Sequence, residues 1–386
     1  MNSSVNTTVF NILLQSIRLN DVQDAVSKAE SIISENIINW DDLYSASGQH
    51  SIRPQLAKLI TSVDPSLIPN EFRQKLDLAH HEILYRQMSF VSEFLKIRQL
   101  LHSAGIMAVP FKGFWIASEF YGNLADRESI DIDLFVRDSD LGQIAAIMIN
   151  EGYKPQNDFL KYSIDEIKKY FHEYNFDRFE GNERLFHVEF HWRMSTENYG
   201  MDITFEDLSS EIAPGKLQDH EIDVFSPSAN LLLTVMHHGG RDLFSELKQV
   251  LDIAMIMKND PGLDWKMILH QADRFKVRNL VLVAVSLASD LSGVQIPEEI
   301  EVIVSSEKIT KLVENRKRFL EQISEMKSGL VLGLNRWWFR MRALTSLRIK
   351  MKLTWLIMVL LFTSFLVPGK LRKYFPYSEL SSRSSL

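Results

Sequence analysis

The stretch PFKGFWIASEFYGNLADRESIDIDLFV, residues 110–136, gives the first indication of how this chain folds. Its last seven residues are apolar except for Asp131 and Asp133, which predicts a strand with both carboxylates on one face. Carboxylates about 7 Å apart along a strand repel each other unless a cation lies between them. Because divalent cations bind oxygen ligands, the alternation predicts a metal site.

Lys112 and Gly113 precede this strand, between a short apolar run and a segment with a helical pattern. Glycine lets the backbone approach a ligand closely, and the first turn of a helix presents N–H groups that have no partner inside the helix. Both features suit an anion, so we predict that a phosphate group binds at this turn.

A second polar row lies in residues 184–192, which are predicted to form a hairpin with the strand 174–179. Alternation puts His187, Glu189 and His191 on one face and bulky apolar residues on the other. Carboxylate oxygens are hard ligands that suit Mg²⁺, so Glu189 is the best candidate for a third ligand or a general base. His191 is expected either to orient a carboxylate or to have only a structural role.

Composition limits the kinds of protein this chain can be. The 386 residues can form two or three subdomains, and the net charge of −7 argues against a surface that coats nucleic acid, although a local basic groove stays open. There is no cysteine, which excludes disulfides, cysteine zinc sites and a cysteine nucleophile. The first residues lack the basic flank and apolar core of a signal peptide, so we expect a cytoplasmic protein.

Hydrophobic periodicity divides the chain into four parts. Residues 1–104 are helical and include a long helix over 70–103, residues 105–225 mix strands with helices, and residues 226–330 are helical again. Residues 331–386 form a basic and aromatic tail with an apolar helix. We therefore predict an α/β (α+β) mixed-sheet domain flanked by N-terminal and C-terminal helical regions. Its predicted strands are 106–111, 130–136, 174–179 and 184–192.

The apolar run in the tail covers residues 353–367. These 15 residues are fewer than the roughly 20 that span a bilayer, so we expect a helix that packs on the protein or a partner. Peripheral membrane contact and insertion are the alternatives. Trp337 and Trp338, which precede the run, are expected to form a packing surface, with stacking on nucleic-acid bases as the less favoured alternative.

Two helical segments carry further polar residues. His237 and His238 are adjacent, and adjacent side chains on a helix point about 100° apart, so we expect them to stay apart and to serve structure at a helix end. Asp252 lies in an otherwise apolar helix, where it is either a hydrogen-bonding acid of the core or a substrate contact.

Together these motifs resemble the nucleotidyltransferase superfamily that includes DNA polymerase beta, and most of all a poorly characterised bacterial branch of it. A looser likeness links them to nucleotidyltransferase toxins of the abortive-infection type. The resemblance covers residues 76–284 and leaves out the last sixty or so. The motifs that carry it are Lys112-Gly113, Arg127-x-Ser129-x-Asp131-Ile132-Asp133-Leu134 and Glu189-Phe190-His191-Trp192.

The resemblance implies Mg²⁺-dependent (or Mn²⁺-dependent) transfer of a nucleoside monophosphate from an NTP to an acceptor, with release of pyrophosphate. It implies that Asp131, Asp133 and Glu189 hold the metal ions. It also implies that the nucleotide is bound by Lys112, Gly113, Arg127, Ser129 and His191. Of these residues, Arg127 and Ser129 would either contact phosphate or fix the loop before the strand. Arg127 also has three acidic residues nearby in the sequence, Asp126, Glu128 and Asp131, and a surface ion pair with one of them is the alternative.

Two residues depart from the family pattern. Phe114 follows Gly113 where the family has a second small residue, and Glu189 stands where Asp is commoner. Other hypotheses are therefore a catalytically degenerate relative that binds nucleotide or a partner, and a toxin-type enzyme acting on RNA or protein. A membrane-surface protein of envelope or capsule assembly is a third, based on residues 353–367 alone. The acceptor, the base of the NTP and the oligomeric state are left open.

Overall fold

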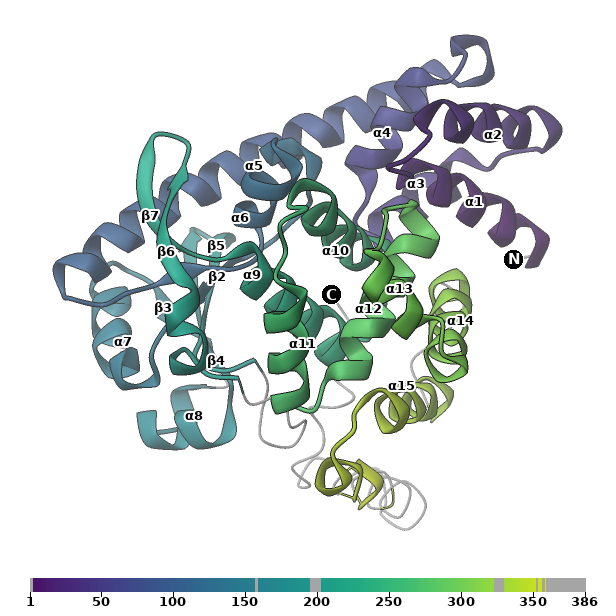
Figure 1. Ribbon diagram of the computed structural model, residues 1–386. Helices are drawn as coiled ribbons and strands as arrows, with labels where there is room; N and C mark the ends of the chain where they lie inside the picture. Colours follow the sequence, from purple (N-terminus) through teal and green to yellow (C-terminus); the bar gives the residue numbers. More distant parts are fainter. Residues whose placement is uncertain are drawn as a thin grey trace, which may run out of the picture.

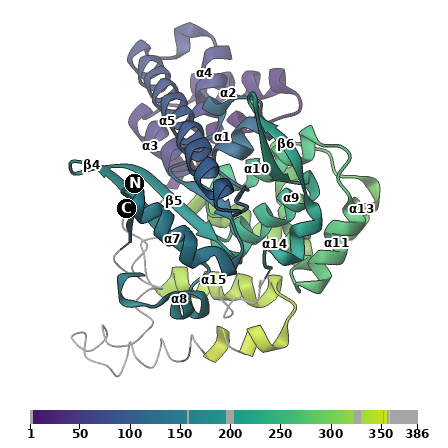
Figure 2. The same cartoon turned by 90° about the vertical axis from the view of Figure 1, so that its left-hand side faces the viewer.

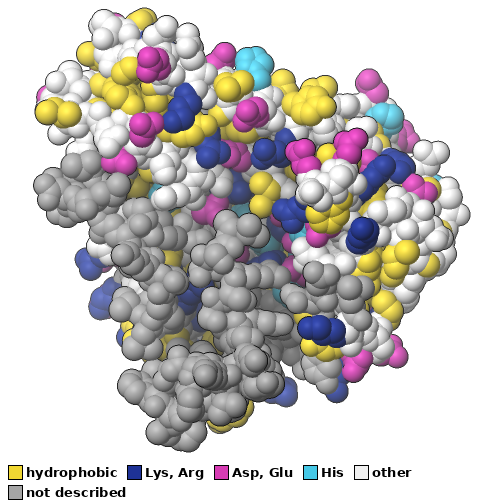
Figure 3. All heavy atoms as spheres, turned by 180° about the vertical axis from the view of Figure 1, so that it is seen from behind, with side chains coloured by type: hydrophobic (Ala, Val, Ile, Leu, Met, Phe, Trp, Pro, Cys, Tyr) yellow, Lys and Arg dark blue, Asp and Glu magenta, His cyan; other side chains and the backbone are white. Residues whose placement is uncertain are grey.

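The computed structural model describes residues 3–156, 159–194, 203–322, 330–351, 353–355 and 358. It is a mixed α/β structure that combines a five-stranded sheet with helical regions from the two ends of the chain, as predicted (Figure 1). On the face seen in Figure 3, the described Lys and Arg side chains are interspersed with Asp and Glu.

The strand order of the sheet is β1 (Val109–Pro110), β2 (Ile132–Phe135), β5 (Glu183–His191), β4 (Glu173–Glu180) and β3 (Lys154–Pro155). Only β2 and β5 are parallel, and the other neighbours are antiparallel. The predicted strand 106–111 is reduced to β1, which ends at a proline that cannot donate to a ladder. A separate hairpin, β6 (Ile212–Leu217) and β7 (His220–Phe225), was not predicted.

The two faces of the sheet differ in polarity, and this difference positions the candidate site. Ile132, Leu134, Val188 and Phe190 lie in an apolar cluster with the second half of α5 (Asn70–Ser103) and with α7 (Leu141–Asn150). The opposite face of the sheet is polar and meets the C-terminal helical region, where Glu173 of β4 forms an ion pair with Arg241 (Figures 1 and 2).

The helix predicted over 70–103 is confirmed as α5. It is long enough to take part in two cores, since Phe72 and Leu76 pack with the N-terminal helices whereas Phe90 and Phe94 pack against the sheet. The N-terminal helices are α1 (Ser3–Ser16), α2 (Val22–Glu35), α3 (Trp40–Gln49), α4 (Arg53–Ser62) and the 3₁₀ turn Pro65–Leu67.

Short helices connect the strands. They are α6 (Phe114–Ile116), the π-helix η2 (Ala117–Tyr121), α8 (Ile164–Tyr170) and the 3₁₀ turns Leu124–Asp126, Asp138–Asp140, Phe159–Lys161 and Glu206–Glu211.

The C-terminal region packs around α12 (Arg278–Ser292), whose residues are mostly buried. One apolar cluster runs from α1 through this region and includes Phe111 and Phe135 beside the sheet, so the helices from both ends of the chain share a core. The other helices are α9 (Pro227–Val235), the π-helix η7 (Met236–Arg241), α10 (Leu247–Asn259), α11 (Trp265–Arg274), α13 (Glu298–Val304), α14 (Glu307–Gln322) and α15 (Leu330–Ala343).

Most of the predicted apolar segment 353–367 lies outside the described residues. Within the part of the chain that is described, no helix combines the length and the apolar character needed to cross a membrane. Trp337 and Trp338 on α15 are half-buried and pack against the apolar core, which agrees with the packing surface predicted for them.

Candidate active site

Asp133, Glu189 and His191 meet on the polar face of the sheet. Asp133 of β2 pairs in register with Glu189 of the parallel strand β5. His191 Nε2 lies 3.1 Å from Asp133 Oδ1 and 3.2 Å from Glu189 Oε2. All three side chains are buried, and one possible ligand atom of each lies within 4.8 Å of the others, so the group could hold a metal ion.

Asp131 precedes β2 in a bend and is half-buried. Burial and the neighbouring carboxylate of Asp133 raise the pKa of Asp131 to about 6, although Lys112 works in the opposite direction. The repulsion indicates that these carboxylates share one environment. A bound divalent cation would reverse that repulsion.

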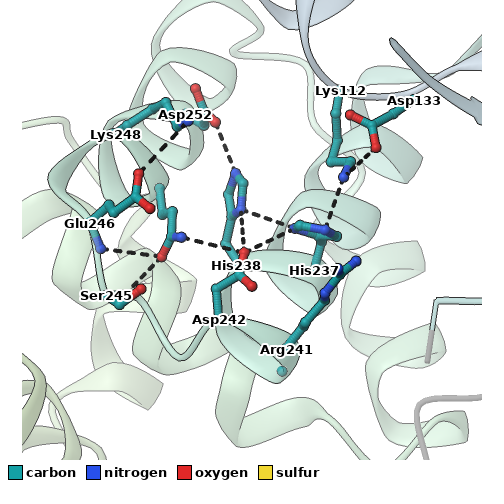
Figure 4. A network of polar contacts seen from close by, with 12 residues as sticks. Lys112, Asp133, His237, His238, Arg241, Asp242, Ser245, Glu246, Lys248 and Asp252 are labelled. Atoms are coloured by element: carbon teal, nitrogen blue, oxygen red, sulfur yellow. Dashed lines mark hydrogen bonds and ion pairs between the residues drawn. The ribbon is translucent and has the colours of Figure 1, made fainter. Parts of the chain in front are cut away.

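Lys112 brings a buried cation to the same carboxylates. Its Nζ lies 2.6 Å from Asp133 Oδ1 and 2.9 Å from His237 Nε2 (Figure 4). Burial would lower the pKa of Lys112, but Asp133, Asp131 and Glu189 together raise it, so the side chain is an ammonium.

Gly113 has a backbone conformation that other residues rarely adopt, with φ +58° and ψ −129°. A Cβ at this position would lie 3.3 Å from the carbonyl oxygen of Asp131. The following residue, Phe114, is fully buried, and its ring centroid is 5.0 Å from that of Phe94 on α5. The large side chain that departs from the family pattern is therefore accommodated by the apolar core.

Arg127 and Ser129 hold the loop before β2 through contacts with Asp252, Gly113 and Gln87. Nε and Nη2 of Arg127 donate to the two carboxylate oxygens of Asp252 at 2.8 Å each, and its Nη1 donates to the Gly113 carbonyl at 3.2 Å. Ser129 exchanges hydrogen bonds with Gln87 of α5. These contacts fit the implied role of fixing the loop, and a contact with phosphate stays a prediction.

The acidic neighbours of Arg127 bind the N-terminal helices instead. Asp126 forms an ion pair with Lys58, and Glu128 accepts from the backbone and the guanidinium of Arg53.

Glu189 is held between two histidines. His187 Nε2 lies 3.1 Å from Glu189 Oε1, and its Nδ1 lies 2.6 Å from Asp177 Oδ1. Burial would lower the pKa of His187, but these two carboxylates raise it to about 10. Burial and Glu173 raise the pKa of Glu189, yet the hydrogen bonds from His187 and His191 bring it well below the usual range. Glu189 is therefore ionised.

Sequence analysis missed two charged residues at this site, Glu173 and Arg241. Glu173 on β4 is the register partner of His191, and Arg241 at the end of η7 donates to Glu173 Oε2 at 2.8 Å. Burial would lower the pKa of Arg241, but Glu173, Glu189, Asp242 and Asp133 raise it. Arg241 is thus a second cation facing the same carboxylates. The available signal was the position of Glu173 directly before the predicted strand 174–179, in alternation with Asn175 and Asp177. No local sequence pattern indicates Arg241.

The expectation that His237 and His238 stay apart is wrong. They lie in the π-helix η7, where the turn is wider than the α-helical turn assumed from the sequence, and their Nδ1 atoms are 3.3 Å apart. Asp242 Oδ2 lies 3.3 Å from His237 Nδ1 and 3.9 Å from His238 Nδ1, so these residues form a second group that could hold a metal ion. Asp252 accepts from His238 Nε2 at 2.8 Å, which makes it a hydrogen-bonding acid of the core.

A family model described as "uncharacterised nucleotidyltransferase" matches residues 36–293. The matched range contains α5, the sheet, η7 and every site residue described above. No curated protein matches the chain.

Proposed function

The chain belongs to this uncharacterised nucleotidyltransferase family, and we propose that it transfers a nucleoside monophosphate from an NTP to a hydroxyl or phosphate acceptor, releasing pyrophosphate. One observation carries the proposal: the register places Asp133 beside Glu189, with the Lys112 ammonium 2.6 Å from Asp133. Clustered carboxylates and a buried cation are the groups that a metal-bound triphosphate needs.

The donor set suits a hard divalent cation. Asp133 and Glu189 offer carboxylate oxygens, which Mg²⁺ prefers, and the imidazole of His191 beside them would also suit Mn²⁺. Asp131, which is electrostatically coupled to both carboxylates, is the third proposed ligand. When bound, such a cation neutralises phosphate charge and activates the attacking oxygen. The raised pKa of Asp131 supports this assignment, because the crowded negative charge would be relieved by a cation.

The two cations face the position where a triphosphate would lie. We infer that the Lys112 ammonium exchanges Asp133 for a phosphate oxygen, while the Gly113 turn lets the backbone approach the phosphates. Arg241, whose side chain is 26% exposed, is the second cation available to them. In the reaction an acceptor oxygen forms a bond to the α-phosphorus, and the bond from that phosphorus to the bridging oxygen breaks to release pyrophosphate. Where the acceptor is a hydroxyl, a carboxylate takes its proton.

Within this proposal we group the chain with the superfamily of DNA polymerase beta. The support is the placement of Lys112-Gly113, Asp131-Ile132-Asp133 and Glu189-Phe190-His191-Trp192 around one mixed sheet. The alternative of a degenerate relative rested on Phe114. This side chain packs against Phe94 in the apolar core, so its size gives no steric argument for a loss of activity.

The test is transfer of label from α-labelled NTPs. The purified protein, Mg²⁺ or Mn²⁺, a mixture of the four NTPs and cell extract should yield a labelled adduct that mass spectrometry can identify. The double variant Asp133→Asn/Glu189→Gln should abolish the label. The matched control Glu221→Gln/Asp223→Asn makes the same chemical changes on β7 and should label like the wild type. Equal labelling by the site variant would refute the proposal. Nucleotide binding without turnover would favour the degenerate relative.

A further inference from the structure

A continuous chain of hydrogen bonds leads away from the carboxylates through two histidines. Lys112 Nζ lies 2.9 Å from His237 Nε2, His237 Nδ1 lies 3.3 Å from His238 Nδ1, and His238 Nε2 lies 2.8 Å from Asp252 Oδ2 (Figure 4). The four side chains are buried. Buried polar groups are costly unless they are paired, so the direction of each bond can be worked out.

The ammonium at one end determines where the proton of His237 lies. An ammonium can only donate, so His237 Nε2 must carry the lone pair and its Nδ1 the hydrogen. That hydrogen faces two acceptors at 3.3 Å, His238 Nδ1 and Asp242 Oδ2, and His238 Nε2 donates to the Asp252 carboxylate. The His237 imidazole, with its lone pair at Nε2, is therefore neutral. Burial, followed by Lys112 and Arg241, brings the pKa of His237 well below its usual range, in agreement with a neutral ring.

The chain closes into a ring at the turn that carries Lys112. Asp252 also accepts from Arg127, and Arg127 Nη1 donates to the carbonyl of Gly113, the residue covalently bonded to Lys112. The ring therefore constrains the Lys112 side chain at one end and the Gly113 backbone at the other. Its members come from the Lys112–Gly113 turn, the loop before β2, the π-helix η7 and α10.

We propose that His237 and His238 are positioning residues that aim the Lys112 ammonium at the carboxylates and keep it available to an incoming triphosphate. This inference rests on the proposed function. His237 is the partner that Lys112 can keep when it gives up Asp133, because the imidazole is neutral and does not compete for the phosphate. His238 acts through His237, since its Nδ1 lies 3.3 Å from His237 Nδ1 and its Nε2 donates to Asp252.

The same residues, with Asp242, could hold a metal ion, and the proton positions decide between the two roles. Coordination through His237 Nδ1 would move its hydrogen to Nε2, which would then oppose the Lys112 ammonium 2.9 Å away. The hydrogen-bonded ring and a metal ion at Nδ1 therefore exclude each other.

The first experiment reads the protons directly, without nucleotide. Long-range ¹H–¹⁵N spectra of histidine-labelled protein, assigned with His237→Gln and His238→Gln, should show His237 protonated at Nδ1 and His238 at Nε2. Added Zn²⁺ at stoichiometric concentration should leave both signals in place. Protonation of His237 at Nε2, or loss of both Nδ1 signals with Zn²⁺, would overturn the proposal.

The second experiment measures binding of inorganic tripolyphosphate with Mn²⁺, together with the KM and kcat for NTP. His237→Ala should weaken tripolyphosphate binding about tenfold or more and raise KM more than it lowers kcat. His237→Gln should recover much of the loss, because its amide oxygen can accept from Lys112. The control is His50→Ala, which truncates another buried histidine and should leave binding unchanged.

The two outcomes separate the two proposals. Wild-type binding by His237→Ala in folded protein would overturn the positioning role. The predicted proton positions in a protein that transfers no label would leave the ring in place and refute the nucleotidyl transfer.

Discussion

Replacing Asp252 with Asn tests how the loop before β2 is held. The Asp252 side chain is fully buried and accepts four hydrogen bonds, each 2.8 Å long: two from Arg127, one from the Tyr121 hydroxyl and one from His238. Asn has nearly the same shape, but it has no charge and turns one oxygen into an amide donor that faces other donors. The change therefore leaves Arg127 buried without a counter-ion.

The expected cost is large because a partner of a buried charge is removed. Breaking a buried ion pair from one side costs about 3–5 kcal/mol, whereas each hydrogen bond to a charged group contributes roughly 1.5–3 kcal/mol. The four bonds share one carboxylate and are not additive, so we expect a loss of about 3–5 kcal/mol in the free energy of unfolding.

The pH dependence has a defined sign. Burial would raise the pKa of Asp252, but Arg127 and His238 hold it far below its ordinary value. The stabilisation is therefore present above the unfolded pKa of about 3.9 and declines only as the pH falls below it. The difference between wild type and Asp252→Asn should stay constant from pH 5 to pH 9.

Urea unfolding followed by circular dichroism measures this difference. The matched control is Asp273→Asn, which removes the acid of the exposed ion pair between Asp273 and Arg278. Such surface pairs contribute about 0–1 kcal/mol. Two results would show that the ion pair does not hold the loop as we describe. One is a free energy of unfolding for Asp252→Asn within 1 kcal/mol of that of the control. The other is a difference in free energy of unfolding from the wild type that changes between pH 5 and pH 9.

Three further predictions concern the core and the turn. Burial lowers the pKa of His50 to about 4. The free energy of unfolding of the wild type should therefore fall by about 3 kcal/mol between pH 6.5 and pH 4, because the unfolded chain binds the proton more readily. Urea unfolding should show a smaller fall for His50→Asn over the same range. Phe114→Ala should lower the free energy of unfolding by about 3–5 kcal/mol. Phe114→Leu should lower it less, and the variant should still transfer label. If a Phe114 variant lost labelling activity while its stability stayed intact, Phe114 would belong to the site. Gly113→Ala should lower the free energy of unfolding by about 1–3 kcal/mol and weaken tripolyphosphate binding. The control Gly122→Ala, which has open space around its Cβ position, should leave binding unchanged. Equal binding by both variants would contradict a close approach of the phosphates to Gly113.

Patterns that repeat within one element could be read from the sequence. The helix over 70–103 follows from its apolar period, and β5 shows the expected alternation, with Val188 in the apolar cluster and Glu189 on the polar face beside His191. These features are local, because the backbone geometry of a helix or strand alone decides which side chains share a face.

Pairings between distant elements could not be read in this way. Arg127 has acids on both sides in the sequence, yet its partner is Asp252, 125 residues away. His237 and His238 converge because η7 is a π-helix, and no local pattern distinguishes that turn from an α-helical one. Arg241 reaches Glu173 only because η7 packs against the polar face of the sheet.

The sequence by itself determined the residue types and their alternation, and with them the expectation of a cation near Asp131 and Asp133 and a phosphate near Lys112. The tertiary structure decided that Glu189 pairs in register with Asp133, and that Lys112 is shared between Asp133 and His237. The physical reason is that register and helix placement follow from burying apolar faces formed by distant segments. A buried charge must then pair with whichever group that packing brings near it.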